Sequence, residues 1–264
     1  MISFLGPKGT FTHEAASKIG DNLTDYCSIP QVMESVESEK YLKGVVPIEN
    51  SIEGSVGITL DSLAHKFNLK ISGEIILPIN HHLLSNVDFS KIEDVYSHPQ
   101  ALAQCQSFLD ENNFTSHYAL STAQAAKNIL NMDNAGAIGT LKAAELYGLN
   151  IVESNIQDTD NNQTRFVVLS KKDCEKTGHD KTSIVFSIYE DYPGQLYQIL
   201  EVFAKNNVNL TKIESRPSKK GLGKYIFFID FLGHRNDENI KEILDKIEKL
   251  VPFIKILGSY PVNL

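Results

Sequence analysis

The chain has 264 residues, of which 42 % are hydrophobic and 22 % charged, and its net charge at pH 7 is −8. This composition is typical of a globular protein with one large domain or two smaller ones, and it excludes disordered and fibrous classes. Residues 181–264 carry 12 basic and 10 acidic side chains, so residues 1–180 carry 13 and 23, a net charge of −10. Nucleic acid requires a concentrated basic face, so we expect no nucleic-acid partner.

Three cysteines, Cys27, Cys105 and Cys174, are widely spaced and form no Cys-x-x-Cys pair. Their odd number and spacing favour a reducing compartment and argue against a zinc site or a disulfide framework. The N-terminal residues MISFLGPKG have no basic residues before a short apolar run, which predicts a strand and not a signal peptide. No segment is long and apolar enough to cross a bilayer. We therefore expect a cytoplasmic protein with no membrane partner.

Residues 1–150 alternate between apolar strands and helical segments. The five units, each a strand followed by a helix, are MISFL with GPKGTFTHEAASKI, GVVPIE with NSIEGSVGITLDSLAHKF, DVYSH with PQALAQCQSFLDEN, HYAL with STAQAAKNIL, and AGAIGT with LKAAELYG. This alternation predicts a parallel α/β architecture, in which ligands bind beyond the carboxyl ends of the strands. Free backbone N–H groups at the helix starts attract carboxylates and phosphates, so we expect a cleft for a small anion.

Two helix starts carry capping patterns. Ser121 with Gln124 fits a capping box, as does Ser97 with Gln100, and Pro99 suits the first turn of a helix.

The charged segment 171–181, KKDCEKTGHDK, predicts a linker because it contains a glycine and no core residues. After it, the patterns TSIVFSIY, QLYQILEVFAKN, VNLTKIES, KYIFFIDFL, ENIKEILDKIEKL and FIKILGSY predict strands and helices in the order βαββαβ. EDYPG and RPSKKGLG are expected to be turns. One face of the first helix carries Leu196, Ile199, Leu200 and Phe203. One face of the second helix carries Ile240, Ile243, Leu244, Ile247 and Leu250. The order is that of a ferredoxin-like domain.

Four short segments share hydroxyl, amide or guanidinium donors at the ends of apolar strands. They are PIENS (47–51), SHPQALAQC (97–105), STAQAA (121–126) and QTRF (163–166). Arg165 is the only arginine among residues 1–180. The glycine-rich GPKGTFT lacks both the Walker ending and the Rossmann spacing, so it is not a nucleotide motif.

The ordered set GPKGTFT, VVPIENSIEGSV, SHPQALAQC, STAQAA and NQTRF, followed by PG-x-L and IESRP, resembles the prephenate dehydratase family over nearly the whole chain. No chorismate mutase segment precedes these motifs, so the resemblance is to the monofunctional form with a C-terminal ACT regulatory domain. It implies a two-lobed parallel α/β catalytic domain, like a periplasmic binding protein. We expect that domain at 1–172, with lobe 1 at about 1–76 and 154–172 and lobe 2 at about 77–153. A linker at 173–181 and the ACT domain at 182–264 follow.

The resemblance implies dehydration and decarboxylation of prephenate to phenylpyruvate, with Thr164 as the catalytic residue and no metal or organic cofactor. Prephenate has two carboxylates, and its ring hydroxyl leaves as water while the ring carboxylate leaves as CO2. Aromatisation drives this reaction, so the enzyme has to orient the dianion and assist the leaving hydroxyl. Because a threonine hydroxyl is a weak acid, we expect it to donate a hydrogen bond and not to transfer its proton fully. The expected substrate-binding residues are Arg165, Phe166, Glu49, Asn50, Ser51, Ser97, Gln104 and Thr122.

Arg165 and several residues outside this set also have a simpler structural interpretation. Arg165 could bind a substrate carboxylate through its planar guanidinium, or it could pair with Glu49 and only support the site, since neighbouring strand residues point in opposite directions. His98, before a proline, is expected to be structural, and Lys8 is either a turn residue or a carboxylate partner. His81 and His82 have no third ligand at a suitable spacing, so we expect no metal site.

The ACT resemblance also implies an effector site for L-phenylalanine and a homo-oligomer formed through the ACT domains, either a dimer or a tetramer. The expected effector-binding residues are Gly194, Gln195, Leu196, Asn209, Leu210, Glu214 and Ser215. Where the family pattern reads Gly-Ala-Leu-Val, this chain has Gly194-Gln195-Leu196-Tyr197, whereas Glu-Ser-Arg-Pro is intact at 214–217. The larger residues bear on effector affinity and identity. A domain that only dimerises is the alternative.

Two other functions remain open at this point. Arogenate dehydratase acts on a substrate with an amino group in place of the keto group, and its family tends to lack the glutamate of IEGSV and the following TLDSL. This chain retains Glu53 and Thr59-Leu60-Asp61, which favours prephenate. The second alternative is a non-catalytic carboxylate sensor, and the intact Thr164 argues against it.

Overall fold

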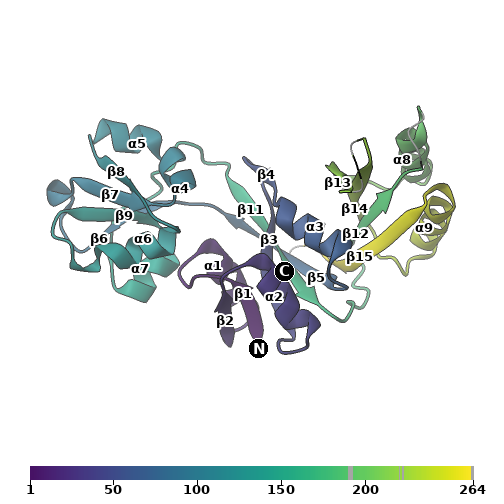
Figure 1. Cartoon of the computed structure of the whole chain (residues 1–264), viewed down its shortest axis with the longest axis horizontal. Helices are drawn as coiled ribbons and strands as arrows, with labels where there is room; N and C mark the ends of the chain where they lie inside the picture. The colour runs from purple at the N-terminus through teal and green to yellow at the C-terminus, as the bar shows by residue number, and fades with distance from the viewer. Residues whose placement is uncertain (190–192, 220, 222, 263–264) are drawn as a thin grey trace. The chain divides into compact units, whose positions relative to one another are not determined.

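Three β-sheets organise the chain in a computed structural model, which describes residues 1–189, 193–219, 221 and 223–262 (Figure 1). The described residues form two compact units. The first contains Met1–Thr59 and Ile76–Phe166, and the second contains Leu60–Ile75 and Val167–Leu264. The predicted combination of α/β sheets and a C-terminal βαββαβ domain is confirmed.

The first sheet contains the N-terminal strand. Its spatial order is β2 (Leu23–Tyr26), β1 (Ile2–Leu5), β3 (Lys43–Asn50), β11 (Gln163–Ser170) and β5 (Lys70–Pro78), with the short β4 (Gly54–Ser55) beside β3. The helices between these strands are α1 (Phe11–Ser17), α2 (Ile29–Glu37) and α3 (Gly57–His65). Strand β1 runs parallel to β2 and β3, as predicted, whereas β4 is antiparallel to β3. The chain thus folds back after Asn50, in a segment where the sequence predicted one continuous helix.

The second sheet is mixed. Its order is β10 (Asn150–Glu153), β6 (His82–Ser85), β9 (Ala135–Gly139), β7 (Asp94–Ser97) and β8 (Thr115–Tyr118). Its helical segments are η1 (Phe89–Lys91), α4 (Pro99–Ala103), α5 (Gln106–Glu111), α6 (Thr122–Asn128), η2 (Ile129–Asn131) and α7 (Leu141–Tyr147). Strand β7 is parallel to β8 and β9, but β6 is antiparallel to both of its neighbours. The predicted strand–helix units therefore form parallel pairs around one reversed strand.

Alternating side chains give the second sheet two apolar faces. Leu83 and Ile138 pack with Ala101, Leu102 and Leu109 of α4 and α5. Their strand neighbours Leu84 and Ala137 pack with alanines of α6 and α7 on the other face. Since successive strand residues point to opposite sides, helices can cover both faces, as Figure 1 shows.

The segment 99–112, predicted as one helix, is two helices that break at Gln104 and Cys105. Its cap also differs from the prediction. The side chain of His98, not that of Ser97, accepts a hydrogen bond from the Gln100 N–H, which agrees with the structural role predicted for His98. Ser121 is the N-cap of α6, because its hydroxyl accepts the Gln124 N–H at 3.0 Å, whereas the Gln124 side chain donates to Asn128 at 2.7 Å. Because of this break, Gln104 is the C-cap residue of α4 and not a residue in the interior of a helix.

The third sheet forms the C-terminal domain. Its order is β13 (Leu210–Pro217), β14 (Tyr225–Leu232), β12 (Asp180–Ser187) and β15 (Phe253–Pro261), and its helices are α8 (Gln195–Lys205) and α9 (Glu238–Leu250). Of the predicted helix faces, Ile199 and Phe203 are buried and Leu196 and Leu200 pack against the core. Residues 240, 243, 244 and 247 are also buried, but Leu250 is exposed and was wrongly assigned to the core.

Parts of two predicted turns, residues 190–192 of EDYPG and residues 220 and 222 of RPSKKGLG, lie outside the described residues.

Strand β12 begins two residues before its predicted start. Lys181, which the sequence analysis placed in a linker, is 8 % exposed, and its ammonium donates to both oxygens of Glu74 at 2.7 and 2.8 Å. Glu74 is fully buried on β5. The end of the charged segment is therefore part of the core of the second unit.

The described part of the chain has no helix that is long and apolar enough to cross a membrane.

Candidate functional site

Asn50, at the end of β3, has a side chain whose orientation is fixed by the backbone. Its Oδ1 accepts hydrogen bonds from the N–H groups of Ile52 and Glu53 at 2.9 and 3.0 Å. A backbone N–H can only donate, so the oxygen must face these groups and the NH2 must face away. That NH2 donates to Thr164 Oγ1 at 2.9 Å and to Asn162 Oδ1 at 2.7 Å. The turn after β3 thus sets the direction of every hydrogen bond that follows.

Thr164, on β11, is partly exposed. Because its oxygen accepts a hydrogen bond from Asn50, the hydroxyl proton is not used in that contact. Among the described residues, no acceptor takes this proton. The geometry therefore leaves Thr164 able to donate a hydrogen bond to a ligand while Asn50 holds its oxygen in place.

The network continues away from Thr164 through Asn162. With Oδ1 occupied by Asn50, the Asn162 NH2 donates to Gln104 Oε1 at 3.0 Å. The same oxygen is 3.0 Å from Nε2 of His81. Asn162 and His81 are buried, with 3 % exposure each, whereas Gln104 is partly exposed. The chain of hydrogen bonds thus runs from Thr164 through Asn50, Asn162 and Gln104 to His81, and Asn50 is its member in direct contact with Thr164.

Residues 156–163 hold the network together through their backbone. The N–H of Ile79 donates to the Asn162 carbonyl at 2.8 Å, and the N–H of Asp158 donates to the Gln104 carbonyl at 2.8 Å. Ser51 joins this segment to the end of β3, since its hydroxyl accepts the Gln163 N–H at 2.9 Å and donates to the Asn161 carbonyl at 3.1 Å. The polar run before β11 is therefore an ordered part of the site.

Arg165 lies on the opposite side of β11 from Thr164, because strand neighbours alternate. Its guanidinium is 3.5 Å from the carboxylate of Glu49, which is likewise the strand neighbour of Asn50. The two pairs, Asn50 with Thr164 and Glu49 with Arg165, thus face different ways. Of the two possible roles of Arg165, this ion pair favours support of the site; direct contact with a substrate carboxylate stays a prediction.

Three other predicted substrate-binding residues, Ser97, Phe166 and Thr122, lie outside this hydrogen-bond network, as does Lys8, the possible carboxylate partner. Ser97 is fully buried, and its hydroxyl donates to the Ile138 carbonyl at 2.7 Å, which ties β7 to β9. Phe166 is 2 % exposed. Thr122 is partly exposed in the first turn of α6, and Lys8 is exposed. Of these four, Thr122 and Lys8 are open to a ligand in this structure.

Sequence reasoning missed two members of the network, Asn162 and the role of His81. Asn162 is the first residue of the NQTRF motif, but the sequence analysis gave a role only to the residues after Gln163. His81 was interpreted only as a possible metal ligand. Its position directly before β6 was not predicted, since β6 itself was not predicted.

The predicted effector residues all belong to the second unit. Gly194 precedes α8 with a positive φ of 95°, a conformation that favours glycine. Gln195 is 7 % exposed and Leu196 packs on the core, while Asn209 and Leu210 lie at the start of β13. The Glu214 carboxylate is 3.2 Å from Lys212 and 3.6 Å from Arg216, and Ser215 is exposed.

Helix α3 has polar contacts on both sides of its first turns. Thr59 is fully buried and donates to the Pro47 carbonyl at 2.7 Å, just before Glu49 and Asn50. Asp61 accepts from Arg216 at 3.0 Å and pairs with Lys219 at 2.8 Å. Burial alone would raise the pKa of Asp61, but the hydrogen bonds from these two cations lower it. Residues of the TLDSL segment thus contact both the PIENS segment and the ESRP segment.

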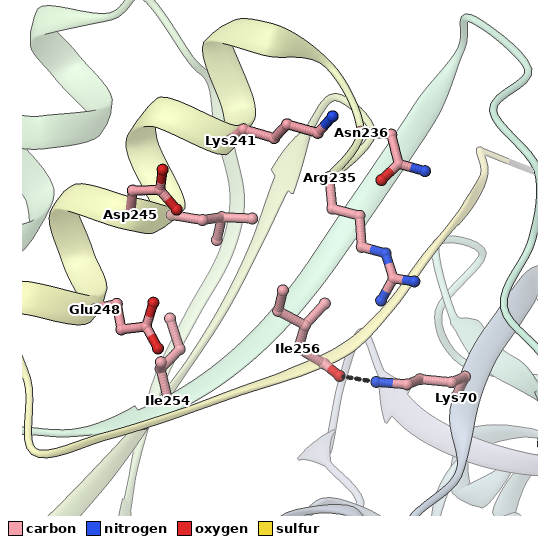
Figure 2. Close-up of a pocket in the computed structure, with 9 residues that line it drawn as sticks. Lys70, Arg235, Asn236, Lys241, Asp245, Glu248, Ile254 and Ile256 are labelled. Carbon is pink, nitrogen blue, oxygen red and sulfur yellow. Dashed lines mark hydrogen bonds between the residues drawn. The ribbon is translucent and has the colours of Figure 1, made fainter.

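A pocket of about 530 Å³ lies in the second unit, between α9 and β15 (Figure 2). Two of its cations are already engaged, since the Lys70 ammonium donates to the Ile256 carbonyl at 2.7 Å and Arg235 pairs with Asp173. A third, Lys241, shares the helix wall with Asp245 and Glu248, whose carboxylates would repel an anion. The pocket is therefore a poor site for a dianion, unlike the network around Thr164.

We expect Asn50→Asp to lower kcat for prephenate, the substrate that the family resemblance implies, about 100-fold. The substitution reverses the direction of the hydrogen bond between residue 50 and Thr164. Aspartate keeps the oxygen that accepts from Ile52 and Glu53, but its second oxygen replaces the NH2. The Thr164 hydroxyl would then donate to residue 50 and not to a ligand. Steady-state kinetics and thermal unfolding measure the effect, with Asn22→Asp, at an exposed asparagine in the same unit, as the control for added charge. Equal kcat values for the two variants would contradict this role of Asn50.

Comparison with known protein families identifies both parts of the chain. Residues 182–249 match the ACT domain family, so the chain combines an α/β domain with a C-terminal ACT domain. Residues 2–174 match the family Prephenate dehydratase. The chain belongs to the prephenate dehydratase family.

Individual relatives are similar to this chain over nearly its full length. Prephenate dehydratase of Methanocaldococcus jannaschii is 47 % identical over 97 % of this chain and 96 % of that protein. The crystal structure of prephenate dehydratase from Arthrobacter aurescens in complex with L-Phe has a TM-score of 0.90 at 36 % identity, covering 98 % of this chain and 89 % of that one. GqqA, described as a novel type of quorum quenching acylase, has a TM-score of 0.89 at 26 % identity, covering 99 % of this chain and 98 % of that one.

Proposed function

We propose that this protein is a prephenate dehydratase, which converts prephenate to phenylpyruvate for L-phenylalanine biosynthesis. The observation that carries the proposal is the Asn50–Thr164 contact, which leaves the threonine proton free for a leaving hydroxyl. Full-length similarity to prephenate dehydratases supports the same reaction.

In this reaction the bond from the ring to its carboxylate breaks, and the electron pair enters the ring as CO2 leaves. The C–O bond at the opposite ring carbon breaks with its electron pair going to oxygen, and the departing hydroxide takes up a proton from solvent to form water. Thr164 would stabilise the charge that develops on that oxygen by donating a hydrogen bond. The aromatic product provides the driving force, so positioning of the dianion accounts for most of the remaining catalysis.

The other predicted residues support this role in different ways. Asn50 holds the Thr164 oxygen, Ser51 holds the end of β3 against the residues before β11, and Gln104 presents its amide to the site. Glu49 with Arg165 supports the opposite face of the strands. We retain Thr122 as a substrate contact, whereas the buried Ser97 and Phe166 would act by shaping the site.

We propose that the catalytic domain comprises residues 1–172, with lobe 1 at about 1–76 and 154–172 and lobe 2 at about 77–153. The strand composition of the first two sheets supports these lobes. A connection at 173–181, whose last two residues belong to β12, and an ACT domain at 182–264 complete the chain.

Regulation by L-phenylalanine is part of the proposal. A relative was solved in complex with L-Phe, and the ESRP residues are retained here on β13. We propose that effector binding uses residues 194–196, 209–210 and 214–215, and that ACT domains of two copies form a homo-oligomer. Three free cysteines, one of them exposed, support a reducing, cytoplasmic compartment.

Purified protein is expected to turn over prephenate without added metal, and L-phenylalanine is expected to suppress the rate. Phenylpyruvate absorbance measures turnover, and calorimetry measures phenylalanine binding. Arogenate serves as the parallel substrate and is expected to react more slowly, since Glu53 and the TLDSL segment are retained. A parallel assay for acylase activity tests whether this chain shares the activity described for GqqA.

No turnover of either prephenate or arogenate would leave the carboxylate sensor and remove Thr164 as a catalytic residue. Turnover that is indifferent to phenylalanine, with no calorimetric binding, would retain the enzyme and refute its regulation by this amino acid.

A further inference from the structure

His81 is a buried histidine that the proposed chemistry does not use directly. Its ring packs edge-on against Phe11 of the GPKGTFT segment, with ring centroids 5.7 Å apart and planes at 76°. Its backbone N–H donates to Gln157 Oε1 at 2.9 Å, and its carbonyl accepts the Ile156 N–H at 2.9 Å. The imidazole is therefore fixed in place by contacts from two separate parts of the sequence.

The protonation of His81 follows from the direction of the network. Gln104 Oε1 already accepts from the Asn162 NH2, so the atom that faces His81 is an acceptor. His81 Nε2 must then carry the proton. Nδ1 is left as a lone pair that is buried and has no hydrogen-bond partner among the described residues. Burial lowers the pKa of His81, which keeps the ring neutral in this tautomer.

Two donors on one oxygen lock the Gln104 carboxamide. Its NH2 faces away from Asn162 and His81, and among the described residues it donates to no acceptor. If the amide turned by 180°, its NH2 would meet the Asn162 NH2 and its oxygen would face the ligand. His81 could then accept from the amide only with its own proton on Nδ1, which is buried and has no hydrogen-bond partner among the described residues. Donor against donor is repulsive, and an oxygen facing a carboxylate is repulsive as well.

We propose that His81 is a positioning residue that holds Gln104 with its NH2 toward a carboxylate of the substrate. This inference rests on the proposed dehydratase function. Residues 1–180 have a net charge of −10, so a dianionic substrate needs neutral donors that are oriented in advance, because each misplaced acceptor adds repulsion. His81 provides the second of the two bonds that fix this orientation.

Two near-isosteric variants separate the hydrogen bond from the ring. In His81→Gln the side-chain NH2 lies near the position of Nε2 and keeps the donor, whereas His81→Asn places its polar group near Nδ1 and loses it. We expect His81→Asn to raise KM for prephenate about tenfold, the value of one hydrogen bond, with kcat unchanged. His81→Gln is expected to have the KM of the wild type. His82→Asn, at the neighbouring buried histidine that contacts Asn155 and not Gln104, is the control.

A double-mutant cycle tests whether His81 acts through Gln104. In a Gln104→Ala background, His81→Asn is expected to have no further effect on KM, because the amide that it orients is gone. An unchanged KM in His81→Asn, a failure of His81→Gln to restore KM, or an equal increase in the Gln104→Ala background would each overturn the proposal. Wild-type protein without prephenate turnover would instead refute the proposed function, so the two failures are distinct.

Discussion

Thr164→Val is expected to lower kcat for prephenate by about 10²–10³-fold, the usual loss when one donor to a developing oxyanion is removed. Valine has nearly the same shape but no hydroxyl, so the leaving oxygen loses its hydrogen bond. Asn50 retains two other acceptors, Asn162 Oδ1 and the Gln163 carbonyl. We therefore expect the melting temperature to change little, and steady-state kinetics with thermal unfolding measure both quantities.

Thr164→Ser is the matched control, because it restores the hydroxyl without the methyl group. It is expected to keep most of the turnover. If the valine variant retained the activity of the serine variant, Thr164 would not be the group that assists the leaving hydroxyl, and the role of Asn50 in holding it would lose its purpose.

Lys181→Met is expected to destabilise the fold by about 3–5 kcal/mol. It removes an ammonium that contacts both oxygens of Glu74, whose side chain is completely buried. The Coulomb attraction is lost, while the cost of burying the carboxylate remains. Urea or thermal unfolding measures the loss, which corresponds to a fall of roughly 10 °C in melting temperature.

Lys142→Met removes an ion pair with Glu145 on the surface and is expected to change stability little, since solvent screens that pair. The double variant Glu74→Leu with Lys181→Met is expected to recover most of the stability, because it removes the buried charge as well. Equal losses in Lys181→Met and Lys142→Met would show that the Glu74 contact contributes no more than a surface pair.

The sequence predicted the C-terminal domain well because each of its elements buries one face. The periodicity of α8 and α9 places Ile199, Phe203, Ile243 and Ile247 in the core, as observed. The assignment of Leu250 to the core was wrong because periodicity does not show where a helix leaves the sheet. In the first two sheets, the strand–helix units were recognisable, but strand β6 was not predicted. Its four residues are too few to show a periodicity, and an apolar pattern does not indicate the direction of a strand.

The candidate site was predictable in its residue types but not in its connections. Thr164, Asn50 and Gln104 were selected from their motifs, yet the bond directions depend on the fold-back at Ile52 and Glu53, in a segment that was expected to be helical. Gln104 enters the network because the predicted helix breaks at that residue. Contacts over long sequence separations, such as Asn50 with Asn162, are not encoded by local spacing.

Helix α3 has a thermodynamic consequence for regulation. Its Thr59 holds the carbonyl of Pro47, and its Asp61 holds Arg216 of the ESRP segment, so a single short helix contacts both proposed binding segments. If binding of an effector changes the free energy of this helix and thereby the affinity for substrate, binding of substrate must change the affinity for the effector by the same factor. Prephenate would then weaken phenylalanine binding by the same factor by which phenylalanine weakens that of prephenate. The concentration of effector needed for inhibition would rise with the supply of substrate.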